Sequence, residues 1–474
     1  MSPAADGTAF GGLRPPHELV ERALAKSRSE ACIVIVSDAS EADVRFACNT
    51  VTTNGTRRSR SMSVASFVPS DGQMAVGMAS RTTTGDDDEI EQLIAASEAD
   101  ARAGSPAEDE APLVSRSAED PSFAEPAATT GADVLRDVVG GLAGAFERAK
   151  GAGNVLAGFA THQVSSTYLG SSAGLRLRHV QPQGTLELVA RSVDGTRSAW
   201  AGVGTSWFED VELGALEERL SERLAWARRK VELEAGRYET ILPPDATADL
   251  VVMLEEAMSG RDAEDGRNVY SAPGGGTRIG DELSELPFEL RGDPAAKGVE
   301  CAPYVMASAS STDVSVFDNG VPIGPTKWIE GGRLARLRYH RAAARRSKTE
   351  PTFAVDNLTL ELPNATARME DLIAQTERAL LLTCLWYIRE VDPQTLLLTG
   401  LTRDGVYLVE KGEVVGAVNN FRFNESPVEM LARTIEAGRS ERALSREWGE
   451  WQPRTLMPAL RVADFNMSSV SPAT

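Results

Sequence analysis

Cysteine and histidine are both scarce in this sequence. Its 474 residues include only four of each. The cysteines lie far apart and form no Cys-x-x-Cys pair, which argues against a disulfide framework and against a cysteine-rich metal knuckle. The histidines stand singly, with no two at the i, i+4 spacing that places paired metal ligands on one helix face. We therefore expect reduced, mostly buried thiols and no histidine-pair metal site.

Long apolar runs and a basic leader are missing as well. No stretch of about 18 apolar residues occurs, and the first residues, MSPAADGTAFGG, have neither a basic start nor an apolar core. We therefore expect no membrane segment, no secretion signal and a location in the cytosol. The net charge of −20 would repel a phosphate backbone, and the basic runs at 57–60 and 340–348 are short. Nucleic acid is not expected as a ligand.

Apolar residues, in contrast, are plentiful enough for a large core. They make up 42% of a chain whose length favours two or three domains. Helical periodicity and strand-like runs both occur, so the sequence predicts an α+β fold. We expect an N-terminal α/β domain at 1–236. We expect a β-rich C-terminal domain at 237–474, built on a large curved antiparallel sheet or barrel.

The expected N-terminal domain opens on an amphipathic helix at 17–26, followed by an apolar strand at 32–36. Further helices are predicted at 133–150 and 213–231, with short strands between and before them, including strands at 175–180 and 185–193. Near 85–131 the composition becomes acidic and rich in Ala, Ser and Pro, almost without aromatic residues. Because such a segment has little apolar surface to bury, we expect an insert that is partly helical and partly flexible.

Turn signals separate many short strands in the C-terminal domain. A strand at 237–242 is stopped by prolines, and a helix should start near Ala246. Asn319-Gly320 is typical of a β-hairpin turn. One helix is expected to interrupt the strands, from about Met369 to Leu382.

Five segments beyond residue 236, taken in order, resemble the modulator-of-gyrase family, which comprises TldD and TldE (also called PmbA). They are YETILPP at 238–244, SVFDNGVP at 315–322, IEGG at 329–332, DNL at 356–358 and GVYLVEKGE at 405–413. Each segment alone is a common turn or strand, and their order and spacing over roughly 235–465 carry the resemblance. The resemblance implies a heterodimer of TldD-like and TldE-like subunits that degrades or trims peptides.

The TldD branch of this family has an HExxxH helix and a cysteine near its C-terminus, which suit a zinc hydrolase. The matching helix of this chain reads LEEAMS at 254–259, so Leu254 and Ser259 stand at the family's histidine positions. No cysteine occurs from Trp448 onward. We therefore expect no cofactor in this chain, and zinc in a TldD-like partner.

Glu255 is the one residue of that motif that is kept. Leu250, Met253, Leu254 and Ala257 form an apolar stripe at helical spacing, which indicates a face built for packing. Without a metal-bound water to deprotonate, Glu255 is expected to be a solvated helix carboxylate, and it is only a weak candidate for catalysis.

Other residues offer no complete catalytic set. His340 is expected at a strand end or helix start, and Cys384 in the core. No G-x-S-x-G elbow occurs, and the glycine-rich loop at 274–280 lacks the Lys-Ser/Thr ending of a P-loop. That loop fits a plain turn or the border of a peptide groove. The candidates for a substrate groove or an interface are Gly274, Gly275, Gly276, Trp386, Tyr387, Trp448 and Trp451.

Three functions remain open on these grounds. The first is a subunit without its own metal that shapes the substrate site of a TldD/TldE-type zinc metallopeptidase, acting on unfolded or extended peptides. The second is a standalone hydrolase of an amide or peptide-like small molecule. The third is a peptide-binding scaffold with no enzymatic partner. The aromatic candidates are expected in the core or at an interface rather than against substrate.

Overall fold

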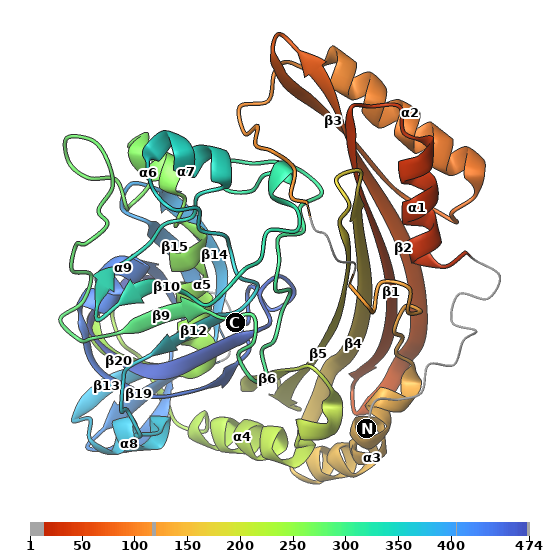
Figure 1. The fold of residues 1–474 in the computed structure, drawn as a ribbon. Helices are drawn as coiled ribbons and strands as arrows, with labels where there is room; N and C mark the ends of the chain where they lie inside the picture. The colour runs from red at the N-terminus through yellow and green to blue at the C-terminus, as the bar shows by residue number, and fades with distance from the viewer. Residues whose placement is uncertain (1–13, 116–119, 404, 472–474) are drawn as a thin grey trace.

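The computed structural model describes residues 14–115, 120–403 and 405–471, which form two large β-sheets with helices packed around them (Figure 1). The first sheet has the strand order β3-β2-β1-β4-β5-β6, and every neighbouring pair is antiparallel. It forms the N-terminal domain. Its strands are β1 (Ala31–Ala47), β2 (Thr50–Ser70), β3 (Gln73–Thr82), β4 (Asn154–Ser171), β5 (Arg176–Ser192) and β6 (Ser198–Thr205).

Alternation of side chains along β1 explains how this sheet is covered. Val34 and Val36 pack beneath α1 (Pro16–Lys26) and α2 (Asp87–Ala103), whereas Phe46 packs with α3 (Arg136–Gly151) and α4 (Leu213–Trp226). On the opposite face, Ile33 packs with Phe317 of the C-terminal domain. Figure 1 shows α1 and α2 on the side of the sheet that faces away from the C-terminal domain.

The strands are longer than the sequence suggested. The segments expected at 175–180 and 185–193 form the single strand β5, because β4 pairs with it without interruption from Gly170 to Asn154. The acidic segment at 85–131 contains α2, which Asp86 caps by accepting a hydrogen bond from the Glu89 backbone N–H. Ile90 on α2 and Phe123 beyond it are buried, so the segment buries more apolar surface than its composition indicates. Residues 116–119 of it lie outside the described residues.

The second sheet forms the β-rich C-terminal domain. It is mainly antiparallel, but β8–β13, β12–β20 and β7–β17 pair in parallel. Its first seven strands are β7 (Lys230–Val231), β8 (Gly236–Leu242), β9 (Glu289–Gly292), β10 (Thr326–Glu330), β11 (Arg333–Leu334), β12 (Leu358–Glu361) and β13 (Arg378–Leu382). The rest are β14 (Leu385–Asp392), β15 (Leu397–Thr402), β16 (Val406–Glu410), β17 (Glu413–Val418), β18 (Phe421–Glu425), β19 (Thr434–Ala443) and β20 (Thr455–Val470).

One long helix, α5 (Pro244–Glu256), lies within the C-terminal domain and contacts β19 and β20. Residues 245–252, 254 and 255 of α5 are all buried, so the helix is enclosed on nearly every side. The domain's other helices are short: α6 (Gly260–Glu264), α7 (Arg341–Ser347), α8 (Met369–Ala374) and α9 (Pro427–Ala432). Within the described ranges, no helix has the length and apolar character that a membrane crossing requires.

Among the local predictions for secondary structure that were wrong, three are explained by strand pairing or by burial of a side chain. The helix expected from Met369 to Leu382 ends as α8 at Ala374, because residues 378–382 pair with β8 and β16 as β13. Val231 lies in β7 rather than on α4. Asn319-Gly320 closes no hairpin. The Asn319 side chain is buried instead, where its amide oxygen accepts from the Ala307 N–H and its amide nitrogen donates to the Ala307 carbonyl.

Candidate functional site

The segment that matches the family's metal-binding helix divides between two elements. Leu254 lies in α5, is 0% exposed and packs in the core of the C-terminal domain. The helix ends at Glu256, and Ser259 caps α6 by accepting a hydrogen bond from the Asp262 N–H at 3.2 Å. The expectation of one helix over 254–259 is therefore wrong. The Asn268 side chain holds the intervening turn by donating to the Ala257 and Ser259 carbonyls, each at 2.9 Å.

Glu255 is buried, which contradicts the expected solvated carboxylate. Its side chain lies 3.5 Å from the guanidinium of Arg338, which is itself only 7% exposed. Burial raises the pKa of Glu255 to about 7, and the positive charge of Arg338 opposes that shift. Arg338 also pairs with Asp313 at 3.1 Å and Glu256 at 3.4 Å, and donates to the Glu256 carbonyl. Glu255 is buried because α5 is enclosed by the sheet.

These residues do not fit a zinc ion. Leu254 offers no donor atom, the Ser259 hydroxyl already caps α6, and Glu255 faces a guanidinium that would repel a cation. Across 14–115, 120–403 and 405–471, no three His, Cys, Asp or Glu side chains come together in a way that could hold a metal ion.

A pocket of about 600 Å³ opens beside this ion-pair cluster. Met253, Ala257 and Ser259 contribute to its wall, and Arg267 is a cation on its lining. The lining also includes the carboxylates of Glu256, Asp262, Asp313 and Glu390. This excess of acidic groups suits contact with a cationic side chain, but it provides no pair of nucleophile and base.

Replacing Leu254 with histidine tests whether this position is a packing site. We expect Leu254→His to lower the free energy of unfolding by at least about 2 kcal/mol, because the change removes apolar contacts and buries a polar ring. Urea denaturation would measure the loss. The control is Met253→His, at a half-buried position on the pocket wall, which should cost clearly less. Equal losses in the two variants would contradict the packing role.

Earlier in α5 lies a second buried carboxylate that the sequence did not single out. Asp249 is 0% exposed and accepts hydrogen bonds from the Ser445 hydroxyl at 2.5 Å and the Glu447 N–H at 2.8 Å. Its backbone carbonyl accepts from the Trp448 indole N–H at 3.0 Å. Burial raises the pKa of Asp249 to about 8. One turn earlier, Asp245 accepts from the Leu444 N–H. Two aspartates at i, i+4 in an otherwise apolar helix are the sequence signal that could have predicted these buried carboxylates.

The four aromatic candidates form two edge-on pairs near this segment. Trp386 and Tyr387 have ring centroids 5.5 Å apart, and Trp448 and Trp451 have centroids 6.2 Å apart. Trp386 and Trp448 are half-buried, whereas Tyr387 is 55% and Trp451 is 53% exposed. Tyr387 and Trp451 are therefore not in the core, and a place for the four at a substrate groove or an interface stays a prediction.

Arg446 ties one of these pairs to the N-terminal domain. Its guanidinium lies over Trp386 at 4.2 Å from the ring centroid and over Trp200 of β6 at 5.5 Å. Trp386 therefore stands at the contact between the two domains.

The glycine loop forms a turn. Gly274, Gly275 and Gly276 have φ values of 92°, 108° and 84°, which favour glycine, and the Ala272 N–H donates to the Gly276 carbonyl at 2.9 Å. Gly276 also lines a pocket of about 770 Å³ with residues of α6, α7 and 106–108. Its role in a peptide groove remains a prediction.

His340 and Cys384 lie where they were expected. His340 is the N-cap of α7, with its ring Nδ1 accepting from the Ala343 N–H at 3.3 Å. Cys384 is buried, as are Cys32 and Cys301, whereas Cys48 is exposed. Among the described residues, neither His340 nor Cys384 belongs to a group of three or more His, Cys, Asp or Glu side chains that could hold a metal ion.

Residues 235–469 match the family model of the PmbA/TldA metallopeptidase C-terminal domain. This chain belongs to the PmbA/TldD family. The resemblance seen in the sequence is thereby confirmed. No curated protein matches the chain in sequence.

Solved structures share the fold of this PmbA/TldD-family chain over nearly its whole length. TldE from Thermococcus kodakarensis superposes with a TM-score of 0.75 at 16% identity, covering 95% of this chain and 98% of that one. A proposed modulator of DNA gyrase from Bacteroides thetaiotaomicron gives 0.75 at 13%, with 96% and 98% covered. Another from Thermotoga maritima gives 0.74 at 15%, with 95% and 99% covered. At these identities the likeness shows the fold alone.

Proposed function

We propose that this chain is a TldE-like subunit of a heterodimeric metallopeptidase, and that it shapes the substrate site without binding zinc itself. A TldD-like partner would supply the zinc, and the assembly would trim or degrade unfolded or extended peptides in the cytosol. The observation that carries the proposal is the fully buried Leu254, which stands where the family's zinc helix has a histidine. A ligand position filled by a core side chain is consistent with a subunit that has no metal of its own.

The surroundings of Glu255 support the same assignment. A general base must reach a water or substrate proton, but Glu255 is 7% exposed and faces Arg338. Its neighbours Asp313 and Glu256 share that guanidinium, so the carboxylate belongs to an internal ion-pair cluster. Glu255 is therefore better suited to fixing the end of α5 than to activating water.

An uncovered sheet edge supports a role in holding extended chains. β3 pairs only with Ser61–Ser70 of β2, and residues 50–59 of β2 are exposed. The Arg60 carbonyl accepts from the Thr83 N–H, so alternation turns the backbone groups of Thr56 outward as well. Among the described residues no strand pairs with this edge, which offers backbone hydrogen bonds to an added strand.

The test is to produce the chain alone and together with a TldD-like chain whose HExxxH motif is intact. We expect the two chains to co-purify, with about one zinc per heterodimer and cleavage of an unfolded fluorescent peptide only in the complex. Zinc content by mass spectrometry and the rate of peptide cleavage are the two measurements. Stoichiometric zinc or robust cleavage by the isolated chain would overturn the proposal.

One substitution in the same assay separates this proposal from a standalone hydrolase. In a hydrolase with its own site, Glu255→Gln should abolish activity, whereas the subunit proposal expects little change in the complex. Glu256→Gln is the matched control, because Glu256 is the half-exposed neighbour on the same helix. A chain that binds peptide but never co-purifies with a TldD-like partner would instead be a scaffold.

A further inference from the structure

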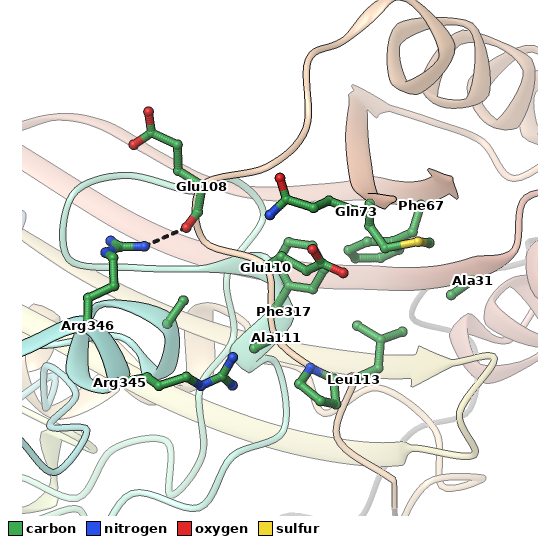
Figure 2. A pocket seen from close by; sticks show the side chains of 13 residues that line it. Ala31, Phe67, Gln73, Glu108, Glu110, Ala111, Leu113, Phe317, Arg345 and Arg346 are labelled. Atoms are coloured by element: carbon green, nitrogen blue, oxygen red, sulfur yellow. Dashed lines mark hydrogen bonds between the residues drawn. The ribbon is translucent and has the colours of Figure 1, made fainter. Parts of the chain in front are cut away.

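A pocket of about 600 Å³ lies between the two domains, away from the end of α5 (Figure 2). Its apolar lining includes Phe67 of β2, Phe317 of the C-terminal domain and Leu113 of the segment at 106–113. The Phe67 and Phe317 rings pack with centroids 4.9 Å apart. Both rings are almost completely buried, at 1% and 2% exposed, so the apolar surface that a ligand can reach comes from the partly exposed Met74 and Leu113.

Two opposite charges on the lining have no side-chain partner in the part of the chain that the structure describes. Glu110 comes from the segment at 106–113 and Arg345 from α7, as Figure 2 shows. Within the described ranges, neither side chain takes part in a hydrogen bond or an ion pair. The other charged groups nearby are engaged, because Arg346 donates to the Glu108 carbonyl at 2.6 Å and the Glu108 carboxylate pairs with Arg261 at 3.0 Å. One carboxylate and one guanidinium thus remain available to a ligand.

The segment that carries Glu110 is held in place on both sides. The Ala107 N–H donates to the Met74 carbonyl at 2.8 Å, and the Ser310 hydroxyl donates to Asp109 at 2.6 Å. The side chain of Ala111, next to Glu110, is buried against the core shared by the two domains. Because these contacts fix the backbone around Glu110, its carboxylate is presented from a defined position. A prearranged charge of this kind lowers the entropy cost of binding.

We propose that this pocket binds a short zwitterionic peptide with apolar side chains. Arg345 takes the terminal carboxylate, Glu110 takes the terminal ammonium group, and Met74 and Leu113 contact the side chains. The balanced pair of charges disfavours simple anions and simple cations, and the apolar side chains of Met74 and Leu113 disfavour strongly polar ligands. The volume is within the range of small-molecule sites. This site goes beyond the proposed function, since binding here requires neither zinc nor a second subunit.

The experiment is calorimetric titration of the isolated full-length chain with the dipeptide Phe-Leu, N-acetyl-Phe-Leu and Phe-Leu amide. We expect Phe-Leu to bind and each blocked form to bind about ten-fold more weakly or worse, because each loses one charge-assisted contact. Arg345→Gln should remove the preference for the free carboxylate and leave that for the free amine. Glu110→Gln should do the reverse. This crossed pattern would not result from general destabilisation.

Matched controls are available on the surface. Lys297→Gln and Glu285→Gln remove one cation and one anion at exposed positions outside the pocket, and both should bind Phe-Leu like the unmodified chain. Absence of Phe-Leu binding at millimolar concentration would overturn the site, as would equal binding of the blocked forms or equal loss in the controls. None of these results depends on zinc or on cleavage, so failure of this site is distinguishable from failure of the subunit proposal.

Discussion

Arg338→Met should lower the free energy of unfolding by about 3–5 kcal/mol at pH 8. Among the described residues, Arg338 is the only cation that pairs with Glu255, Asp313 and Glu256, and its side chain is 7% exposed. Methionine fills similar space but leaves the carboxylates facing each other with no positive charge between them. Urea denaturation of the variant and the unmodified chain at pH 8 would measure the difference.

The loss should become smaller at lower pH. The pKa of Glu255 is raised to about 7, so at pH 5.5 this carboxyl is mostly protonated and needs Arg338 less. Removing the guanidinium takes away a cause that lowers this pKa, which strengthens the trend. Arg333→Met, which breaks the exposed pair with Glu282, is the control and should cost no more than about 1 kcal/mol. A pH-independent loss, or one no larger than the control's, would contradict the role of the cluster.

Asp249→Asn should flatten the dependence of stability on pH between about 4 and 8. Burial raises the pKa of Asp249 from its ordinary 3.8 to about 8, so across this window the folded chain holds a proton that the unfolded chain releases. Stability contributed by this group therefore falls as pH rises, by up to about 1.4 kcal/mol per pH unit. Asparagine has no such proton but keeps an oxygen for the Ser445 hydroxyl and the Glu447 N–H.

Urea denaturation at half-unit steps from pH 4.5 to 8.5 would show the effect as a difference in slope between the two proteins. Asp71→Asn, on an exposed turn after β2, is the matched control and should keep the slope of the unmodified chain. If Asp249→Asn also keeps that slope, Asp249 does not carry the proton in the folded state.

Sequence reasoning succeeded where local pattern decides the structure. The helices α1, α3 and α4 have strong apolar periodicity over three or more turns, and all were predicted close to their positions. It failed for residues 378–382, whose run of Leu side chains suits a helix and a buried strand equally well. Pairing with β8, more than a hundred residues earlier in the chain, decides in favour of the strand. Such long-range pairing leaves no mark in the local pattern.

The candidate site depends even more on contacts between residues that are far apart in the sequence, which local patterns do not predict. Glu255 looks like an exposed carboxylate in the sequence because its partner Arg338 lies 83 residues away. Asp249 meets Ser445 across 196 residues, and the pocket between the domains draws its charged groups from two distant segments. The substitutions at Leu254 and Ser259 were visible only because a family pattern was available for comparison. Burial and pairing of the acidic residues required the tertiary structure.

The exposed edge of β2 at residues 50–59 affects how the chain behaves before it assembles with a partner. A long exposed edge with outward-facing backbone groups is a template on which copies of the same chain can stack. Arginines at 57 and 58 oppose stacking by mutual repulsion, and Val51 is the one large apolar side chain among residues 50–59. A chain produced in excess of its partner would thus be kept from aggregating mainly by charge repulsion, and high salt would weaken that repulsion.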